Sequence, residues 1–138
     1  MRLSARIAVG LVGLFNFILG LGFLFSPIQL ATRFALSPIE TQGLATIRAD
    51  FPAFFLTGAI FAMVGAWRAN PKPLLVPLVL LSFALAGRFV SIAIDGMVST
   101  TFPPMIAEAL MIGIILLARR ALVSGSAADP TSERVAAS

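Results

Sequence analysis

Residues 7–25 form a run of 19 residues that is apolar except for Asn16 and contains no charged side chain. A membrane-spanning helix needs about 20 mostly apolar residues, because the hydrocarbon core of a bilayer is about 30 Å thick and a helix rises about 1.5 Å per residue. Three further runs approach or reach this length, at residues 51–67, 74–94 and 102–118. The four runs predict an all-α fold, a bundle of four transmembrane helices.

The composition agrees with a chain that lies mostly within a bilayer. Hydrophobic residues make up 59% of the 138 residues, charged residues make up 12%, and the mean hydropathy is +1.00. Soluble domains carry about 25% charged residues. Much of the apolar surface is therefore expected to face lipid instead of a large core, which makes the lipid bilayer the first expected partner.

The chain contains no cysteine, histidine or tyrosine. These absences exclude thiol chemistry, proton transfer by imidazole, and the usual zinc and haem sites. We therefore predict no catalytic residue, metal site or cofactor, and an enzyme is the least favoured class, although Asp95 or Glu108 could act as a general acid or base. The formal net charge of +4 is explained by basic residues at the ends of the spans, so nucleic acid is not an expected partner.

Basic residues flank the apolar runs in a pattern that predicts their orientation. They form three pairs, before the first run, between the second and third, and after the fourth: Arg2 and Arg6, Arg68 and Lys72, Arg119 and Arg120. If all four runs cross the membrane, the three pairs lie on one side, which the positive-inside rule assigns to the cytoplasm. We expect a multi-pass protein of the cell inner membrane with both termini in the cytoplasm.

The connections outside the spans carry their own signals. The tetrapeptides SPIQ (26–29) and SPIE (37–40) each place a serine before a proline, and Ser37 with Glu40 fits a capping box. One or two short interfacial helices are therefore expected between the first two spans. Residues 124–138 are small, polar and unpatterned, and we expect a disordered cytoplasmic tail of residues 121–138 after a single membrane domain of residues 1–120.

Ionisable residues within or beside the spans are the main candidates for a functional site. Alternating spans place five of them in the outer half of the membrane: Arg48, Asp50, Arg88, Asp95 and Glu108. A lone charge within a bilayer is costly, so these groups are expected to pair with one another. Two positive and three negative groups leave one carboxylate to be protonated, solvated, or matched by a cation or ligand.

Other residues near these charges complete the candidate site. Arg88, Ser91 and Asp95 lie at positions i, i+3 and i+7, which is one stripe of a helix, and this stripe is expected to face other helices. Four further side chains are candidates for the lining of a pocket: Phe51, Phe54, Phe55 and Asn16. A hydrogen-bonding role between helices is the more economical interpretation of the asparagine.

Two functions remain open on these observations. The first is an outward-facing charged pocket within the membrane that binds a lipid, a small amphipathic molecule or a cation, because the ionisable residues gather in one leaflet. The second is a structural or accessory subunit, as a homo-oligomer or within a larger membrane complex, in which the ion pairs only hold the helices together. Transport is less favoured, because four helices are few for alternating access and no inverted repeat is evident.

A set of short motifs on consecutive spans resembles the pattern of a family of short bacterial four-helix membrane proteins, domain of unknown function 4345: IRADF (47–51), GR (87–88), Ser91, DG (95–96) and Glu108. The resemblance covers about residues 5–118 and implies a four-helix integral membrane fold without an assigned activity. More remotely, the layout is similar to DoxX-like and sterol-isomerase-like four-helix proteins, in which acidic membrane residues can serve bound lipids or quinones. That likeness is an analogy of fold.

Overall fold

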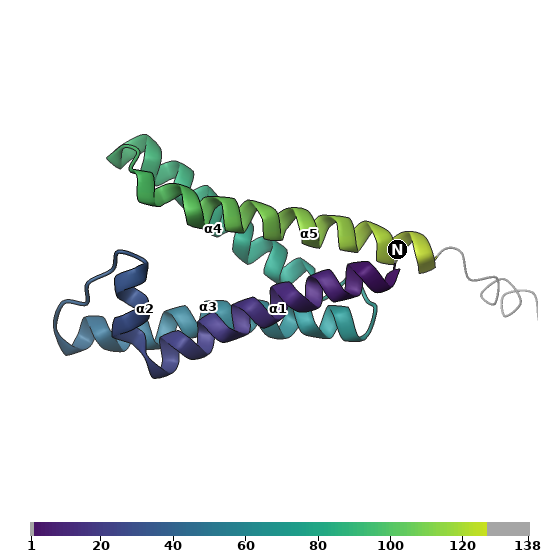
Figure 1. Ribbon diagram of the computed structural model, residues 1–138, viewed down its shortest axis with the longest axis horizontal. Coiled ribbons are helices and arrows are strands. Elements are labelled where there is room, and N and C mark those ends of the chain that lie inside the picture. Colours follow the sequence, from purple (N-terminus) through teal and green to yellow (C-terminus); the bar gives the residue numbers. More distant parts are fainter. Residues whose placement is uncertain (1, 127–138) are drawn as a thin grey trace, which may run out of the picture.

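The computed structural model describes residues 2–126 of the chain, which form helices joined by short connections (Figure 1). In chain order the elements are α1 (Arg2–Phe25), α2 (Pro27–Arg33), α3 (Glu40–Trp67), α4 (Leu75–Asp95), the short 3₁₀ helix η1 (Ser99–Thr101) and α5 (Phe102–Ser126). The helices α1, α3 and α4, and α5 together with η1, are long and apolar enough to cross a membrane. The predicted all-α bundle of four apolar helices is therefore confirmed, and this architecture is that of a multi-pass membrane protein.

The four long helices form two antiparallel pairs. In Figure 1 α1 runs beside α3, and α4 forms a hairpin with α5 that crosses the first pair. Between the pairs, α1 packs against α5 and α3 packs against α4. The two pairs meet near the N-terminus of the chain and diverge toward the opposite end, which is occupied by α2 and by the turn between α4 and α5.

Glycines on one face of α1 allow α1 and α3 to approach closely. A β-carbon added at Gly13 would lie 2.7 Å from Cγ of Met63, and one added at Gly20 would lie 2.6 Å from Cγ of Leu56. Close approach of backbones at small residues is the usual way in which helices pack within a bilayer, where no hydrophobic effect drives them together. The tight α1–α3 pair therefore depends on these two glycines.

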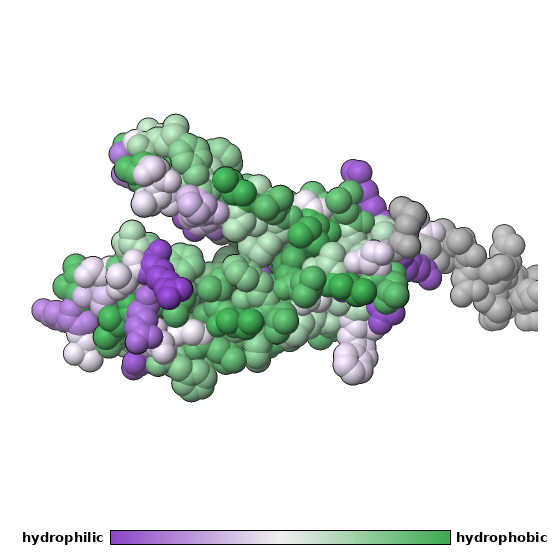
Figure 2. Space-filling model, viewed as in Figure 1, coloured by the Kyte–Doolittle hydropathy of each residue, from purple (hydrophilic) through white to green (hydrophobic). Residues whose placement is uncertain are grey.

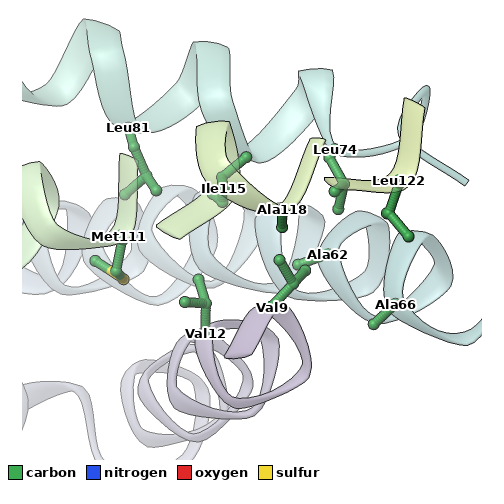
Figure 3. Packing of buried hydrophobic residues seen from close by; sticks show 10 residues of the cluster. All are labelled: Val9, Val12, Ala62, Ala66, Leu74, Leu81, Met111, Ile115, Ala118 and Leu122. Atoms are coloured by element: carbon green, nitrogen blue, oxygen red, sulfur yellow. The ribbon is translucent and has the colours of Figure 1, made fainter. Parts of the chain in front are cut away.

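Buried apolar side chains hold the two pairs together at one end of the bundle (Figure 3). This core cluster draws on α1, α3, α4, α5 and the loop before α4: Val9, Val12, Ala62, Ala66, Leu74, Leu81, Met111, Ile115, Ala118 and Leu122. The only buried residues of α4 are Pro77 and Leu81, both in its first two turns, and α5 has no buried residue before Glu108. The rest of the α4–α5 hairpin has no comparable contact with α1 and α3, which explains why the pairs diverge.

The core-cluster end also carries the basic pairs. Nε of Arg6 donates to the carbonyl oxygen of Ala66 at 2.8 Å, and Nη2 donates to that of Trp67 at 3.1 Å. These bonds satisfy carbonyls that the end of α3 leaves without helical partners. The start of α1, the α3–α4 loop and the end of α5 all lie at this end (Figure 1), which we call the basic end. Its assignment to the cytoplasm stays a prediction.

A second cluster fixes α2 at the opposite end. The ring of Phe23 on α1 lies 4.7 Å from that of Phe51, 5.3 Å from Phe34 and 5.7 Å from Phe55, measured between ring centroids. Aromatic rings at these distances pack favourably in tilted or offset arrangements. This aromatic cluster holds the segment that follows α2 against α1 and α3.

Several predicted boundaries need correction. α3 begins at Glu40 and not near residue 51, so the second predicted interfacial helix forms the first turns of α3. The predicted capping box is wrong, because Ile39 occupies the N-cap position and no side chain caps the helix. At the other end of the chain, α5 continues to Ser126, since Leu122 is buried in the core cluster. The rest of the predicted tail, residues 127–138, lies outside the described residues.

Candidate functional site

A cleft of about 610 Å³ lies where the α4–α5 hairpin diverges from the α1–α3 pair. Figure 2 shows it as a hollow between two arms, with apolar surface at its inner end and polar residues on both arms near its open end. Its walls come from every element of the bundle, with α1, α2 and α3 on one side and α4, η1 and α5 on the other. Small-molecule sites have volumes of about 300–1,000 Å³, so the cleft is large enough for an organic ligand.

Apolar side chains form a large part of the cleft lining: Phe15, Leu19, Phe54, Phe55, Leu81 and Met111. Leu81 and Met111 also belong to the core cluster, so the cleft ends where the core cluster begins. Aromatic and aliphatic side chains of this kind match the surface of an acyl chain or another apolar group.

One ion pair crosses from α4 to α5 within the cleft. Nε of Arg88 donates to both carboxylate oxygens of Glu108, at 2.9 and 3.0 Å. The Glu108 residue is only 8% exposed, whereas the side chain of Arg88 is 31% exposed. A buried carboxylate without a partner would be strongly destabilising, and the guanidinium group removes this penalty.

The ion pair uses only Nε of the three guanidinium nitrogens of Arg88, so Nη1 and Nη2 are not engaged by Glu108. Within residues 2–126, Nη1 and Nη2 make no hydrogen bond, and neither of them is enclosed by protein. Because Arg88 lines the cleft, both nitrogens can donate to a molecule that occupies it. Arg88 lies 13 residues after the start of α4, roughly 20 Å along the helix axis, so these donors lie well within the thickness of a bilayer.

A second arginine, which was not among the predicted site residues, also lines the cleft. Arg33, the last residue of α2, lines the wall opposite Arg88, and the exposed hydroxyl-bearing Thr100 on η1 lies at the same cleft. Arg33 is outside the predicted spans, and it reaches the cleft because the aromatic cluster folds α2 back over α1 and α3. The available signal was that Arg33 is one of only two basic residues in the outer connection 26–50.

The prediction that five ionisable residues meet in one cluster is wrong. Only Arg88 and Glu108 form an ion pair among the residues described. Arg48 and Asp50 are exposed on α3 and do not line the cleft. Arg48 and Asp50 therefore lie on a face of α3 that does not meet the Arg88–Glu108 pair.

The stripe on α4 also differs from the prediction. Ser91 and Asp95 are exposed instead of facing other helices, and Oγ of Ser91 donates to a carboxylate oxygen of Asp95 at 2.8 Å. This local bond satisfies both groups within the last turns of α4. The part of the stripe that contacts another helix is therefore Arg88 alone.

The candidate lining residues divide into two groups. Phe54 and Phe55 line the cleft, Phe51 packs in the aromatic cluster, and Phe55 also contacts Phe23 of that cluster. Asn16 is only 4% exposed, and its Nδ2 donates to the carbonyl oxygen of Val12 at 2.9 Å and to the sulfur of Met111 at 3.4 Å. Asn16 therefore connects α1 to α5 below the cleft, and the void beside it, of about 10 Å³, holds at most one water molecule.

Few ionisable groups line the cleft. The ionisable groups that line the cleft are Arg33, Arg88 and Glu108, and the carboxylate is already engaged by Arg88. No group of three or more acidic, histidine or cysteine side chains that could hold a metal ion occurs in the described part of the chain.

No protein-family model, curated protein or solved structure matches this chain. The resemblance to the family of domain of unknown function 4345 therefore stays a prediction based on the motifs alone.

Proposed function

We propose that this chain is a small inner-membrane protein that binds a lipid or a small amphipathic molecule in the cleft between its two helix pairs. The observation that carries the proposal is the pairing of an apolar cleft of about 610 Å³ with an accessible guanidinium group on its wall. An amphipathic molecule offers both surfaces that this cleft requires, an apolar chain and a polar head.

The position of the cleft supports the same ligand class. It opens where the α4–α5 hairpin leaves α1 and α3, which is the part of the bundle away from the basic end (Figures 1 and 2). A lipid can enter such a site from within the bilayer, without moving its apolar part through water. The cation considered in the sequence analysis is disfavoured, because two arginines and one glutamate line the cleft.

The alternative is a structural or accessory subunit, in which the Arg88–Glu108 pair only holds α4 to α5. Large apolar side chains are exposed on α4, among them Phe83, Phe89 and Ile94. They could contact either lipid or a helix of a partner protein. The two functions differ in one respect: a structural subunit has no need for an occupied cleft.

A cleft-filling substitution separates these functions. Ala107 lines the cleft and Ala109, two residues later on α5, is exposed outside it, so Ala107→Phe and Ala109→Phe add the same side chain inside and outside the site. We expect Ala107→Phe to lower the binding of dodecylglycerol and dodecyl phosphate at least tenfold, because the added ring of Phe occupies ligand volume. Ala109→Phe should bind both as the unmodified protein does.

The measurement is native mass spectrometry of adducts on protein in dodecyl maltoside, with thermal unfolding to show that both variants are folded. Equal adduct formation by the unmodified protein and a folded Ala107→Phe variant would contradict binding in the cleft.

A further inference from the structure

We infer that the ligand carries an oxyanion head group, a phosphate or a carboxylate, which binds between Arg33 and Arg88 on opposite walls of the cleft. This inference rests on the proposed function and adds the charge and chemistry of the head group. It follows from the balance of charges in the cleft, which is two guanidinium groups against one carboxylate. The lining therefore has a net charge of +1 that the protein itself does not neutralise.

The geometry of Arg88 specifies the kind of anion. Glu108 is bonded at Nε alone, so the side of the guanidinium group that carries Nη1 and Nη2 is available. Two parallel N–H donors of this kind match two oxygens of a carboxylate or phosphate. Glu108 is a positioning residue, because its bond to Nε fixes the plane in which the other two nitrogens lie.

Arg33 supplies the second charge from the opposite wall. Its side chain is exposed, and it forms no ion pair or hydrogen bond with other described residues. Thr100 adds a neutral hydroxyl at the same cleft. An oxyanion between two arginines is attracted by both positive charges. The apolar side chains that also line the cleft favour an anion that is the head of an amphiphile.

The test compares head groups on one apolar chain. The probes are dodecyl phosphate, uncharged dodecylglycerol and dodecyltrimethylammonium, with inorganic phosphate as the head group alone. Binding is measured on the full chain in dodecyl maltoside, an uncharged host detergent. We expect dodecyl phosphate to bind at least tenfold more tightly than dodecylglycerol, and the trimethylammonium probe to bind more weakly than both.

Three variants assign any preference to the cleft. Arg33→Gln removes the free arginine, and Arg88→Lys retains a positive charge for Glu108 but removes the two outer N–H donors. Each of these two variants should weaken the binding of dodecyl phosphate roughly tenfold, because one charge-assisted contact is lost. The affinity for dodecylglycerol should stay unchanged. Lys72→Gln is the control, because it removes an exposed positive charge at the basic end. It should change the affinity for dodecyl phosphate less than twofold.

Each outcome bears on a different part of the account. Equal binding of the three dodecyl probes, still lowered by Ala107→Phe, would overturn the inference about the head group while the proposed function stands. If Ala107→Phe leaves the binding of the probes unchanged, both the inference about the head group and the proposed function are overturned. If inorganic phosphate binds as tightly as dodecyl phosphate, the cleft is a site for a free anion. This result would contradict the inference that the ligand is an amphiphile. If Arg88→Lys fails to fold, the test of the head group depends on Arg33→Gln alone. This variant is expected to fold, because Arg33 is exposed and forms no ion pair or hydrogen bond with other described residues. If Arg33→Gln still prefers dodecyl phosphate to dodecylglycerol as the unmodified protein does, the inference is overturned.

Discussion

Arg88 uses different nitrogens of its guanidinium group for the protein and for the cleft. Nε holds the carboxylate of Glu108, which is nearly buried, while the two outer nitrogens stay accessible. Under the proposed function the ion pair has a structural role and a binding role, and the two can be separated by substitution. Removal of Arg88 would then affect the fold through Glu108 and the binding of the proposed ligand through the lost donors.

At this scale we predict that Arg88→Ala destabilises the protein by about 3 kcal/mol, because it leaves the buried charge of Glu108 without a partner. The double variant Arg88→Ala/Glu108→Gln removes that charge and should recover at least half of the loss. Chemical unfolding in detergent, followed by circular dichroism, measures the free energy of unfolding of both variants. If the double variant is less stable than Arg88→Ala, the pair does not act through a buried charge.

The sequence was sufficient to find the pair but not its surroundings. The helical rise along each span gives the depth of a residue, which is why Arg88 and Glu108 were predicted to lie near each other. It does not give the rotation of one helix relative to the next, so exposed Arg48 and Asp50 were wrongly placed in the same cluster. Arg33 was missed because its position depends on packing of Phe34 in the aromatic cluster.

The length of the apolar runs predicted the four long helices reliably. All four predicted spans are helical, because a long, mostly apolar segment of this kind satisfies its backbone hydrogen bonds in a bilayer by forming a helix. The boundaries were less reliable, since α3 gains 11 residues before residue 51 and α5 continues beyond residue 120. Both extensions are polar or mixed in sequence, and contacts with other elements determine them.

The α1–α3 pair provides a prediction about its glycines. Gly20→Ala should destabilise the protein by about 1–3 kcal/mol, because the new methyl group overlaps Leu56 and separates the two helices. Gly10→Ala on the same helix is the matched control, since a β-carbon there has no neighbour within 4 Å and alanine favours the helix. Thermal unfolding of both variants in detergent compares them. Equal unfolding temperatures would show that close approach at Gly20 contributes nothing.

At the scale of the whole molecule, the two ends of the bundle have different properties. The basic end is closed by the core cluster and by the hydrogen bonds of Arg6, while the opposite end is divided by the cleft. This asymmetry follows from the distribution of buried residues on α4 and α5, which is restricted to one end of each helix. Hydropathy alone could not predict it, because lipid-facing and cleft-facing residues are equally apolar.

The most direct test of the account is a structure of the full chain determined in a lipid bilayer. We expect elongated non-protein density along the wall formed by Phe54 and Phe55, with its polar end within hydrogen-bonding distance of the outer nitrogens of Arg88. A bundle in which the α4–α5 hairpin closes against α1 and α3, so that side chains fill the cleft, would contradict the central claim that this protein holds an amphiphile between its helix pairs.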